Sequence, residues 1–215
     1  MSARVGEVFE NPVTGERGVV RIAPNKSNGY LLVADLYVRP GGAVTGEHVH
    51  PEFTEAFTVV RGQLGARRDG TDLELGPGMR LEVAAGVAHD WWNTGNEEAR
   101  VVVEAQPAER FLLAIRNLFL LAQDGKTNAK GIPGPLQAVA FGREFADTIR
   151  FTKPPRIVQQ VMFGVLGPLA WLAGRRGSYQ QYALRELPIV DLEPLPPEVA
   201  DLVPSPLANP GNAEA

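Results

Sequence analysis

The sequence predicts a mainly β protein with a helical C-terminal part, and two observations support this division. Residues 1–106 form short runs of β-branched, aromatic and other apolar residues, with Gly, Pro, Asp or Asn at most junctions. Short strands at such spacing are typical of an all-β sandwich or barrel. After Pro107 the apolar residues recur at helical spacing instead.

The β part divides into nine expected strands. The first two flank the segment NPVTGE, whose Asn-Pro and Gly are typical of a hairpin turn. The third is a longer apolar run that ends at Pro40-Gly41-Gly42. No long segment with helical periodicity interrupts the series, which comprises residues 5–10, 18–22, 30–39, 55–60, 63–68, 73–75, 80–83, 89–93 and 100–104.

The helical part begins with residues 108–123, where apolar residues recur at helical spacing until Asp124-Gly125 ends the helix. A second helix is expected within residues 135–149. From residue 187 onward seven prolines stand among acidic and small residues, which favours an extended or disordered tail. We therefore expect a barrel domain, then a helical extension that packs on the barrel or on a partner subunit, and then the tail: residues 1–107, 108–186 and 187–215.

The apolar stretch of residues 157–174 raises the question of a membrane. Its 18 residues are at the lower limit for a membrane span, and Gln159, Gln160 and Pro168 argue against one. Basic residues flank it on both sides and are suited to solvating the helix ends. We expect a buried helical hairpin here, with a peripheral membrane contact as the less favoured alternative.

Composition excludes several classes of function. The chain has 215 residues, 44% of them apolar, and a formal net charge of -4. No basic run is present that would follow a nucleic-acid backbone, so we expect no nucleic-acid partner. The absence of cysteine excludes disulfides, thiolate metal sites and a cysteine nucleophile. The first twelve residues lack the apolar core of a signal peptide, and a cytoplasmic location is therefore expected.

The three histidines of the chain suggest a metal site. His48 and His50 are two residues apart, so on a strand they share one face. Glu55 opens the next expected strand, and His89 begins another in which Trp91 shares its face. Three imidazoles and one carboxylate form a mixed nitrogen and oxygen site suited to one divalent ion of Fe, Mn, Ni, Co, Cu or Zn.

The spacing of these residues resembles the two sequence motifs of the cupin superfamily. The first motif consists of Gly42, His48-Val49-His50, Glu55 and Gly62. The second consists of Gly78, Ala84-Ala85-Gly86, His89 and Asn93. With the strand pattern, the likeness extends over roughly residues 25–106. Ala84 departs from it, because the family usually has proline there.

The resemblance implies a double-stranded β-helix (jelly-roll) barrel that holds a divalent metal ion through His48, His50, Glu55 and His89. Cupins with these ligands include dioxygenases that act on small aromatic or enolisable substrates, as well as isomerases and lyases. A metal-dependent enzyme of the dioxygenase type is therefore the expected function, with Glu55 also a candidate proton donor. The candidate walls of the substrate site are Tyr37, Phe57, Val59 and Trp91, which favour a small hydrophobic or aromatic substrate.

Three alternatives remain open. Cupin barrels also act as non-catalytic modules that bind small molecules, and a fold alone does not assign a reaction. A metal-dependent isomerase or lyase would use the same four ligands. A metal-independent epimerase for sugar nucleotides would leave those ligands unexplained. The extension argues against a bare open barrel, and exposed sheet edges together with the general prevalence of dimers favour a homodimer.

Overall fold

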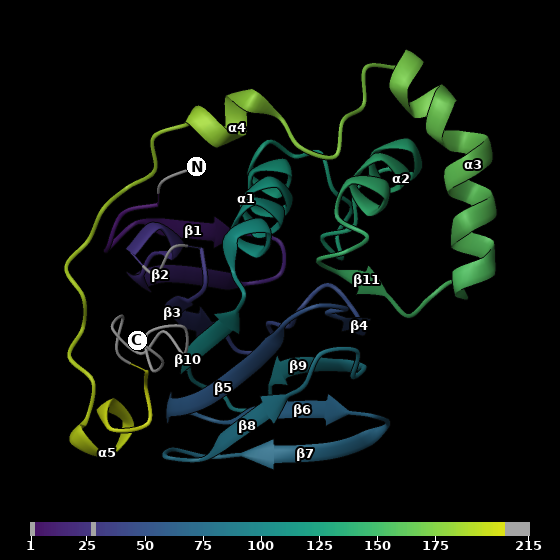
Figure 1. Cartoon of the computed structure of the whole chain (residues 1–215). Coiled ribbons are helices and arrows are strands. Elements are labelled where there is room, and N and C mark those ends of the chain that lie inside the picture. The colour runs from purple at the N-terminus through teal and green to yellow at the C-terminus, as the bar shows by residue number, and fades with distance from the viewer. Residues whose placement is uncertain (1–2, 27–28, 205–215) are drawn as a thin grey trace, which may run out of the picture.

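The computed structural model of the chain describes residues 3–26 and 29–204. It consists of two antiparallel sheets with helices gathered at one end (Figure 1). The larger sheet has the strand order β1 (Val8–Asn11), β2 (Glu16–Ile22), β3 (Leu32–Val38), β10 (Ala99–Gln106), β5 (Thr54–Arg61) and β8 (Arg80–Val83). The smaller has the order β11 (Arg150–Phe151), β4 (His48–Val49), β9 (His89–Asn93), β6 (Leu64–Arg68) and β7 (Thr71–Leu75). The predicted fold class is confirmed, and each of the nine expected strands has a counterpart.

Side chains alternate between the inside and the outside of the barrel. Along β9, His89, Trp91 and Asn93 are buried, whereas Asp90 and Trp92 are partly exposed. This is the two-residue period of a strand with one covered face. Away from the helices, the barrel interior is filled by a core cluster that includes Leu36, Val59, Leu64, Leu75, Leu81, Val83, Trp91 and Val101. The inward side chains of β9 and β5, such as Trp91 and Phe57, pack within this cluster.

The helix α1 (Glu109–Gln123) covers the apolar inner faces of the first strands (Figure 1). Its Phe111, Leu112 and Phe119 belong to one buried cluster with Phe9 and Leu32 of the sheet. Fully burying a large apolar side chain contributes about 1.5–3 kcal/mol. The helix is therefore part of the same core as the strands beside it.

The rest of the extension contains α2 (Pro135–Glu144), α3 (Arg156–Leu172) and α4 (Gln180–Leu184), and it also contributes a strand. β11 pairs with β4, so that Arg150 lies opposite Val49 and Phe151 opposite His48. This strand was not expected from the sequence. It places residues from the C-terminal half of the chain beside the first histidine.

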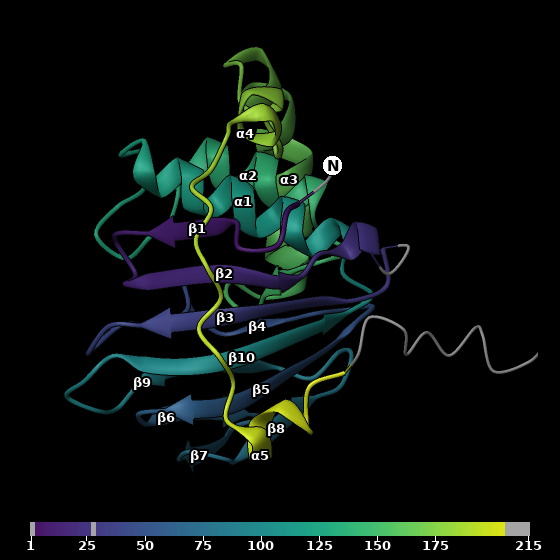
Figure 2. The ribbon, with the colours of Figure 1, turned by 90° about the vertical axis from the view of Figure 1, so that its left-hand side faces the viewer.

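The C-terminal segment crosses the outer face of the larger sheet, as Figure 2 shows. We call residues 186–196 the strap. Backbone hydrogen bonds attach it at Gly6 and Val8, and farther along the backbone oxygens of Glu193 and Pro194 accept hydrogen bonds from Arg100. A short helix, α5 (Pro197–Ala200), follows, and a 3-10 helix at Pro24–Lys26 precedes β3. Of the expected extended tail, residues 205–215 lie outside the described residues.

Within the part of the chain that the structure describes, no helix is both long and apolar enough to cross a membrane. The helix α3 packs one side on α2, where Phe163 meets Gly142. Its other side faces outward, with Ile157 75% and Leu172 73% exposed. The expectation of a buried hairpin is therefore wrong for the outer face of α3.

Candidate metal centre

The four predicted ligands lie together at the helix-covered end of the barrel. One ligand atom from each of His48, His50, Glu55 and His89 lies within 4.8 Å of all the others. Two of the histidines are register partners on neighbouring strands, His48 on β4 and His89 on β9. Glu55 projects from β5 in the opposite sheet. The two sheets thus close the site between them, and all four side chains are buried.

Each imidazole is oriented by a backbone carbonyl. The Nδ1 atoms of His48, His50 and His89 lie 3.0, 2.9 and 3.1 Å from the backbone oxygens of Gly46, Thr148 and Val87. A carbonyl only accepts, so each Nδ1 donates its hydrogen there, and Nε2 is the nitrogen left to face the cluster. Such outer hydrogen bonds orient metal-ligating histidines in proteins. Thr148 belongs to the extension, which thereby positions one ligand of the barrel.

A tight turn before His89 brings the two sequence motifs together. Gly86 has a φ of 80°, in the left-handed region that favours glycine. Its N–H donates to the backbone oxygen of His50 over 2.8 Å, and the N–H of Val87 donates to that of Ala84 over 3.2 Å. The turn therefore forms with alanine where the cupin motif usually has proline.

Burial and the mutual contacts of the cluster set its protonation. Burial, together with the neighbouring His50 and His89, lowers the pKa of His48 to about 3. Burial acts to raise the pKa of Glu55, but its contacts with His50 and His89 outweigh burial and hold that pKa below its usual range. Burial acts to lower the pKa of His89, but the hydrogen bond and the charge of Glu55 outweigh burial, so this pKa is raised. An ionised Glu55 beside a neutral His48 is the form that can bind a cation.

The donor set fits a divalent transition metal ion. Glu55 Oε2 lies 3.2 Å from His50 Nε2 and 3.0 Å from His89 Nε2, so these three donors converge on one point. Ligand bonds of about 2.1 Å allow two donors on one ion to be at most about 4.2 Å apart. The cluster would need to contract by only about 0.6 Å at its widest. These four residues could therefore hold one ion, with space on the cavity side.

A small cavity of about 110 Å³ adjoins the cluster. His48 and Glu55 reach it, and its walls are mainly apolar and include Phe57 and Trp91. Both were predicted to line the substrate site, and both line this cavity. Phe57 and Trp91 are also in contact with each other, with ring centroids 6.3 Å apart. We call this space the inner cavity.

Two predicted wall residues lie elsewhere. Tyr37 is on the outer face of β3, where its hydroxyl donates to Glu193 over 3.0 Å and Arg17 stacks on its ring. The inward residues of that strand are Ala34 and Leu36. Val59 points inward but is fully buried in the packed core, beyond the inner cavity. The sequence could not orient β3, because it is apolar on both faces and both are covered.

The inner cavity contains a carboxyl group that the sequence analysis missed. Glu16, the first residue of β2, lines this cavity together with His48 and Glu55. Burial raises its pKa to about 7, against the hydrogen bond that Thr14 donates to it. The alternation Glu16, Gly18, Val20 along β2 was the available signal, since all three face inward. In the sequence, this glutamate looked like part of a solvated turn.

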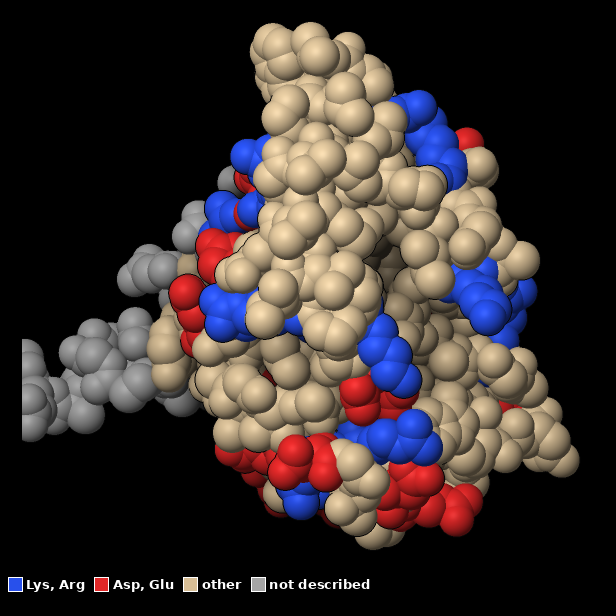
Figure 3. All heavy atoms as spheres, turned by 90° about the vertical axis from the view of Figure 1, so that its right-hand side faces the viewer, with Lys and Arg blue, Asp and Glu red and all other residues tan. Residues whose placement is uncertain are grey.

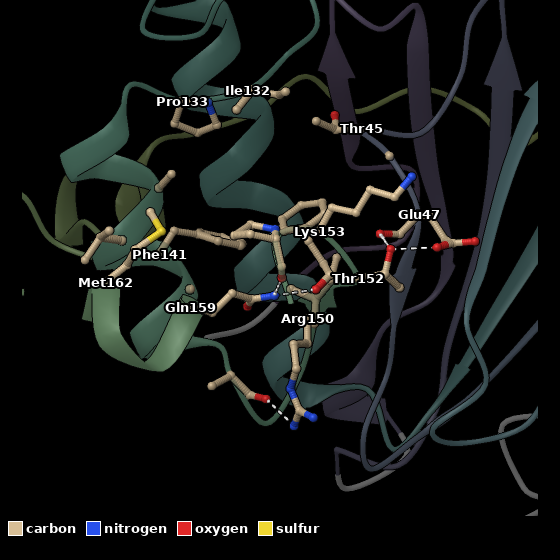
Figure 4. A pocket seen from close by; sticks show the side chains of 18 of the residues that line it. Thr45, Glu47, Ile132, Pro133, Phe141, Arg150, Thr152, Lys153, Gln159 and Met162 are labelled. Carbon is tan, nitrogen blue, oxygen red and sulfur yellow. Dashed lines mark hydrogen bonds between the residues drawn. The ribbon is translucent and has the colours of Figure 1, made fainter. Parts of the chain in front are cut away.

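A second, larger cavity of about 760 Å³ lies between the barrel and the helices α2 and α3. We call it the outer cavity. Figure 4 shows Phe141, Ile132 and Met162 on its helical side, with Lys153 and Glu47 on the barrel side. Thr152 donates to the Glu47 carboxylate over 2.6 Å. The outer and inner cavities adjoin, because both are lined by Thr45, Leu118, Ile149 and Phe151.

Fold and site together define a β-barrel protein with a buried cluster of metal-ligand type. A family model described as the cupin domain matches residues 35–103. A protein named polyketide synthase CurC, from Streptomyces cyaneus, is 30% identical over 113 residues, which are 50% of this chain and 71% of that protein. The chain belongs to the cupin superfamily.

Solved structures of the same fold are more distant. The cupin domain of Cnp3 from Schizosaccharomyces pombe is 11% identical, with a TM-score of 0.40. The match covers 46% of this chain and 66% of that one, just under two thirds of it. A predicted oxalate decarboxylase from Thermotoga maritima is 20% identical, with a TM-score of 0.43, over 49% of this chain and 98% of the other.

Proposed function

We propose that this protein is a metal-dependent enzyme that acts on a small apolar or aromatic substrate with an enolisable carbonyl. The observation that supports this most is a buried cluster of three histidines and one glutamate that opens into an apolar cavity. A divalent ion held there would polarise a carbonyl or enolate oxygen of the substrate as a Lewis acid. Apolar walls favour an organic ring or chain over a sugar nucleotide.

Different residues of the two cavities would contact different parts of the substrate. Phe57 and Trp91 bound the inner cavity and suit the face and edge of a planar substrate. Phe151 and Ile149 stand between the two cavities, so they restrict the access of water from the outer one. The outer cavity is large enough for the remainder of a longer substrate. The relative named polyketide synthase supports this class, since polyketides contain enolisable ketones.

Within this class we favour a dioxygenase-type oxidoreductase, in which both atoms of O₂ enter the substrate. The enol form of a chelating substrate is electron-rich and is the form that reacts with an oxidant. In this reading the chain excludes water and holds the substrate, with Glu55 as a metal ligand that can also transfer a proton if it leaves the metal.

Glu16 favours a second candidate, a metal-dependent isomerase or lyase. A carboxyl group with a pKa of about 7 is suited to giving and taking protons at neutral pH. It faces the same cavity as His48 and Glu55, so a substrate polarised at the cluster would lie beside it. Moving a proton between two carbons of the substrate through Glu16 requires no O₂.

Metal analysis of the purified protein tests the proposal. We expect about one equivalent of a divalent transition metal, and loss of it in His48→Ala and in His89→Ala. Glu47→Gln is the matched control, because Glu47 lines only the outer cavity, and it should retain the metal. Wild-type protein that neither contains nor takes up a metal would refute the metal-dependent function.

Turnover of enolisable aromatic and polyketide-like compounds separates the two reactions. A dioxygenase consumes one O₂ per substrate and stops under anaerobic conditions, whereas an isomerase or lyase continues. If the second reaction is correct, Glu16→Gln should lower kcat by roughly 10²-fold or more and remove the pH dependence near neutrality. A loaded protein that binds these compounds without converting them would support a binding module instead.

A further inference from the structure

The outward face of α3 is apolar along its whole length. Trp171, Val161, Val165 and Leu169 are 63%, 60%, 64% and 51% exposed, in addition to Ile157 and Leu172. At 100° per residue these side chains fall within one continuous arc of the helix, together with Val158, Gly164 and Pro168. No polar residue lies within this arc. We call this set the α3 face.

A soluble protein rarely leaves such a surface open, because contiguous exposed apolar patches mark sites of interaction. In Figure 3 the column of atoms over the upper part of the molecule carries no charged residue, and the acidic groups gather mostly in the lower half. The opposite side of α3 packs against α2, where Phe163 lies against Gly142 and Gly167 lies against Arg143. Within residues 3–26 and 29–204, the side chains of the α3 face are thus left largely exposed.

The stretch of chain that carries this face has charges of one sign. Residues 148–185 contain six basic side chains and no acidic ones, although the whole chain has a net charge of -4. Arg156 begins α3, and Arg175 and Arg176 follow its end. The α3 face therefore has cationic residues at both of its ends. On a helix that lies in a bilayer surface, such residues are at the level of the lipid headgroups. Trp171 suits the same depth, and Arg176 lies 5.5 Å from its ring.

The charge pattern also distinguishes between two kinds of occupant. In a symmetric dimer through the α3 face, the same patch of each copy meets its equivalent. The basic residues at the two helix ends would then approach those of the second copy without acidic partners in this segment. An anionic lipid surface instead provides apolar volume for the stripe and negative charge for its borders.

We propose that α3 lies in the surface of an anionic lipid bilayer, with the α3 face inserted at the level of the acyl chains and Arg156, Arg175 and Arg176 at the headgroups. The inner side of the same helix lines the outer cavity through Gln159, Met162 and Phe163. If the proposed function also holds, an apolar substrate would pass from the lipid into the outer cavity. Docking itself does not depend on that function.

Co-sedimentation with vesicles tests the proposal on the full chain. We expect binding to vesicles of phosphatidylcholine with phosphatidylglycerol, weaker binding to phosphatidylcholine alone, and release of the protein by high salt. The double variant Val161→Glu/Val165→Glu should reduce the bound fraction by roughly tenfold or more, because two inserted side chains become charged. Arg156→Gln/Arg175→Gln should lose the preference for phosphatidylglycerol and retain some binding to both vesicle types.

Met79→Glu is the matched control, and its binding should equal that of the wild type. Met79 is 49% exposed and directly precedes β8, a strand at the other end of the molecule from α3 (Figure 1). Circular dichroism and thermal unfolding establish that each variant is folded. Wild-type protein that ignores both vesicle types would overturn the proposal. So would a wild-type dimer that does not bind vesicles and that Val161→Glu/Val165→Glu converts to monomer, because the α3 face would then be a self-interface.

Discussion

Backbone carbonyls decide which nitrogen of each imidazole in the metal centre is available for binding. Two of these carbonyls, those of Gly46 and Val87, precede their histidine by two residues, so local turns provide them. The third belongs to Thr148, 98 residues away from His50. The tautomers of His48 and His89 are thus fixed locally, whereas that of His50 depends on the folded extension.

The buried carboxyl of Glu16 should make stability depend on pH. Its pKa rises from an ordinary 4.5 to about 7 in the folded protein, so the folded state keeps a proton that the unfolded chain releases. The free energy of unfolding should therefore fall by ~3 kcal/mol between about pH 4.5 and pH 7 on account of this group, and level off above. Because glutamine is neutral throughout, Glu16→Gln should remove this decrease.

Urea unfolding of chelator-treated protein at several pH values measures the effect. The variant should match the wild type at pH 4 to within about 1 kcal/mol and exceed it by ~3 kcal/mol at pH 8. Curves that stay parallel across this range would mean that Glu16 is already ionised in the folded protein. That result would also remove the main support for an isomerase or lyase.

At the residue scale, the sequence was sufficient for the ligands and insufficient for their surroundings. Strand alternation puts His48 and His50 on one face, and the spacing of Glu55 and His89, which resembles the cupin motifs, indicated the other two ligands. Glu16 and Thr148 reach the site from distant segments. The alternation along β2 indicates that Glu16 faces inward but not what it approaches, and no local pattern indicates the position of Thr148. Tyr37 was misplaced because β3 is covered on both faces, by the barrel core and by the C-terminal segment.

At the scale of single elements, a buried ion cluster joins β2, β3, β10 and the strap. Asp35 is fully buried on β3, with its carboxylate oxygens 2.7 Å from Arg21 Nε and 3.2 Å from Arg100 Nε. Arg100 also donates to the backbone oxygens of Glu193 and Pro194. The Glu193 carboxylate also lies 3.1 Å from Arg100, and Arg21 donates to the backbone oxygen of Glu193 as well. Both guanidinium groups therefore attach the strap to the sheet.

Replacing this carboxylate should weaken both the sheet and the strap. Asp35→Asn takes the fully buried carboxylate away from Arg21 and Arg100 and leaves Arg100 only the partly exposed Glu193, which should lower the free energy of unfolding by about 3 kcal/mol. Asp72→Asn is the control, because Asp72 pairs with Arg67 at the surface, and it should unfold much like the wild type. Denaturant unfolding compares them, and limited proteolysis within residues 186–196 should become faster only in Asp35→Asn. Equal stability of the two variants would contradict the structural role of the cluster.

Elements were predicted unevenly, for physical reasons. Nine strands followed from turn residues and apolar runs, which are local signals. β11 has only two residues. It forms by pairing with the edge of β4, where Phe151 lies opposite His48, and such a long-range pairing has no local signal in the sequence. The exposed outer face of α3 was missed because an apolar stretch in a soluble chain usually signals burial.

At the scale of the whole molecule, the extension and the barrel share one hydrophobic core. Deleting residues 108–215 would expose Phe9, Val20 and Leu32, remove β11 from the smaller sheet and take away the carbonyl that orients His50. We therefore expect the truncated protein to aggregate and to bind metal poorly. Light scattering and metal analysis after refolding measure both effects. A monomeric truncated barrel with one equivalent of metal would show that the extension is dispensable for the site.

The carbonyl of Thr148 has a consequence for how the protein is made. The last metal ligand, His89, leaves the ribosome 59 residues before Thr148. At about 5–20 residues per second this interval lasts roughly 3–12 s. During that time the strands that carry the four candidate ligands can pair, while β11 and the carbonyl of Thr148 are still absent. A cation that entered the open end at this stage would be held weakly, because His50 is not yet oriented, and the later arrival of Thr148 would both complete the site and enclose it.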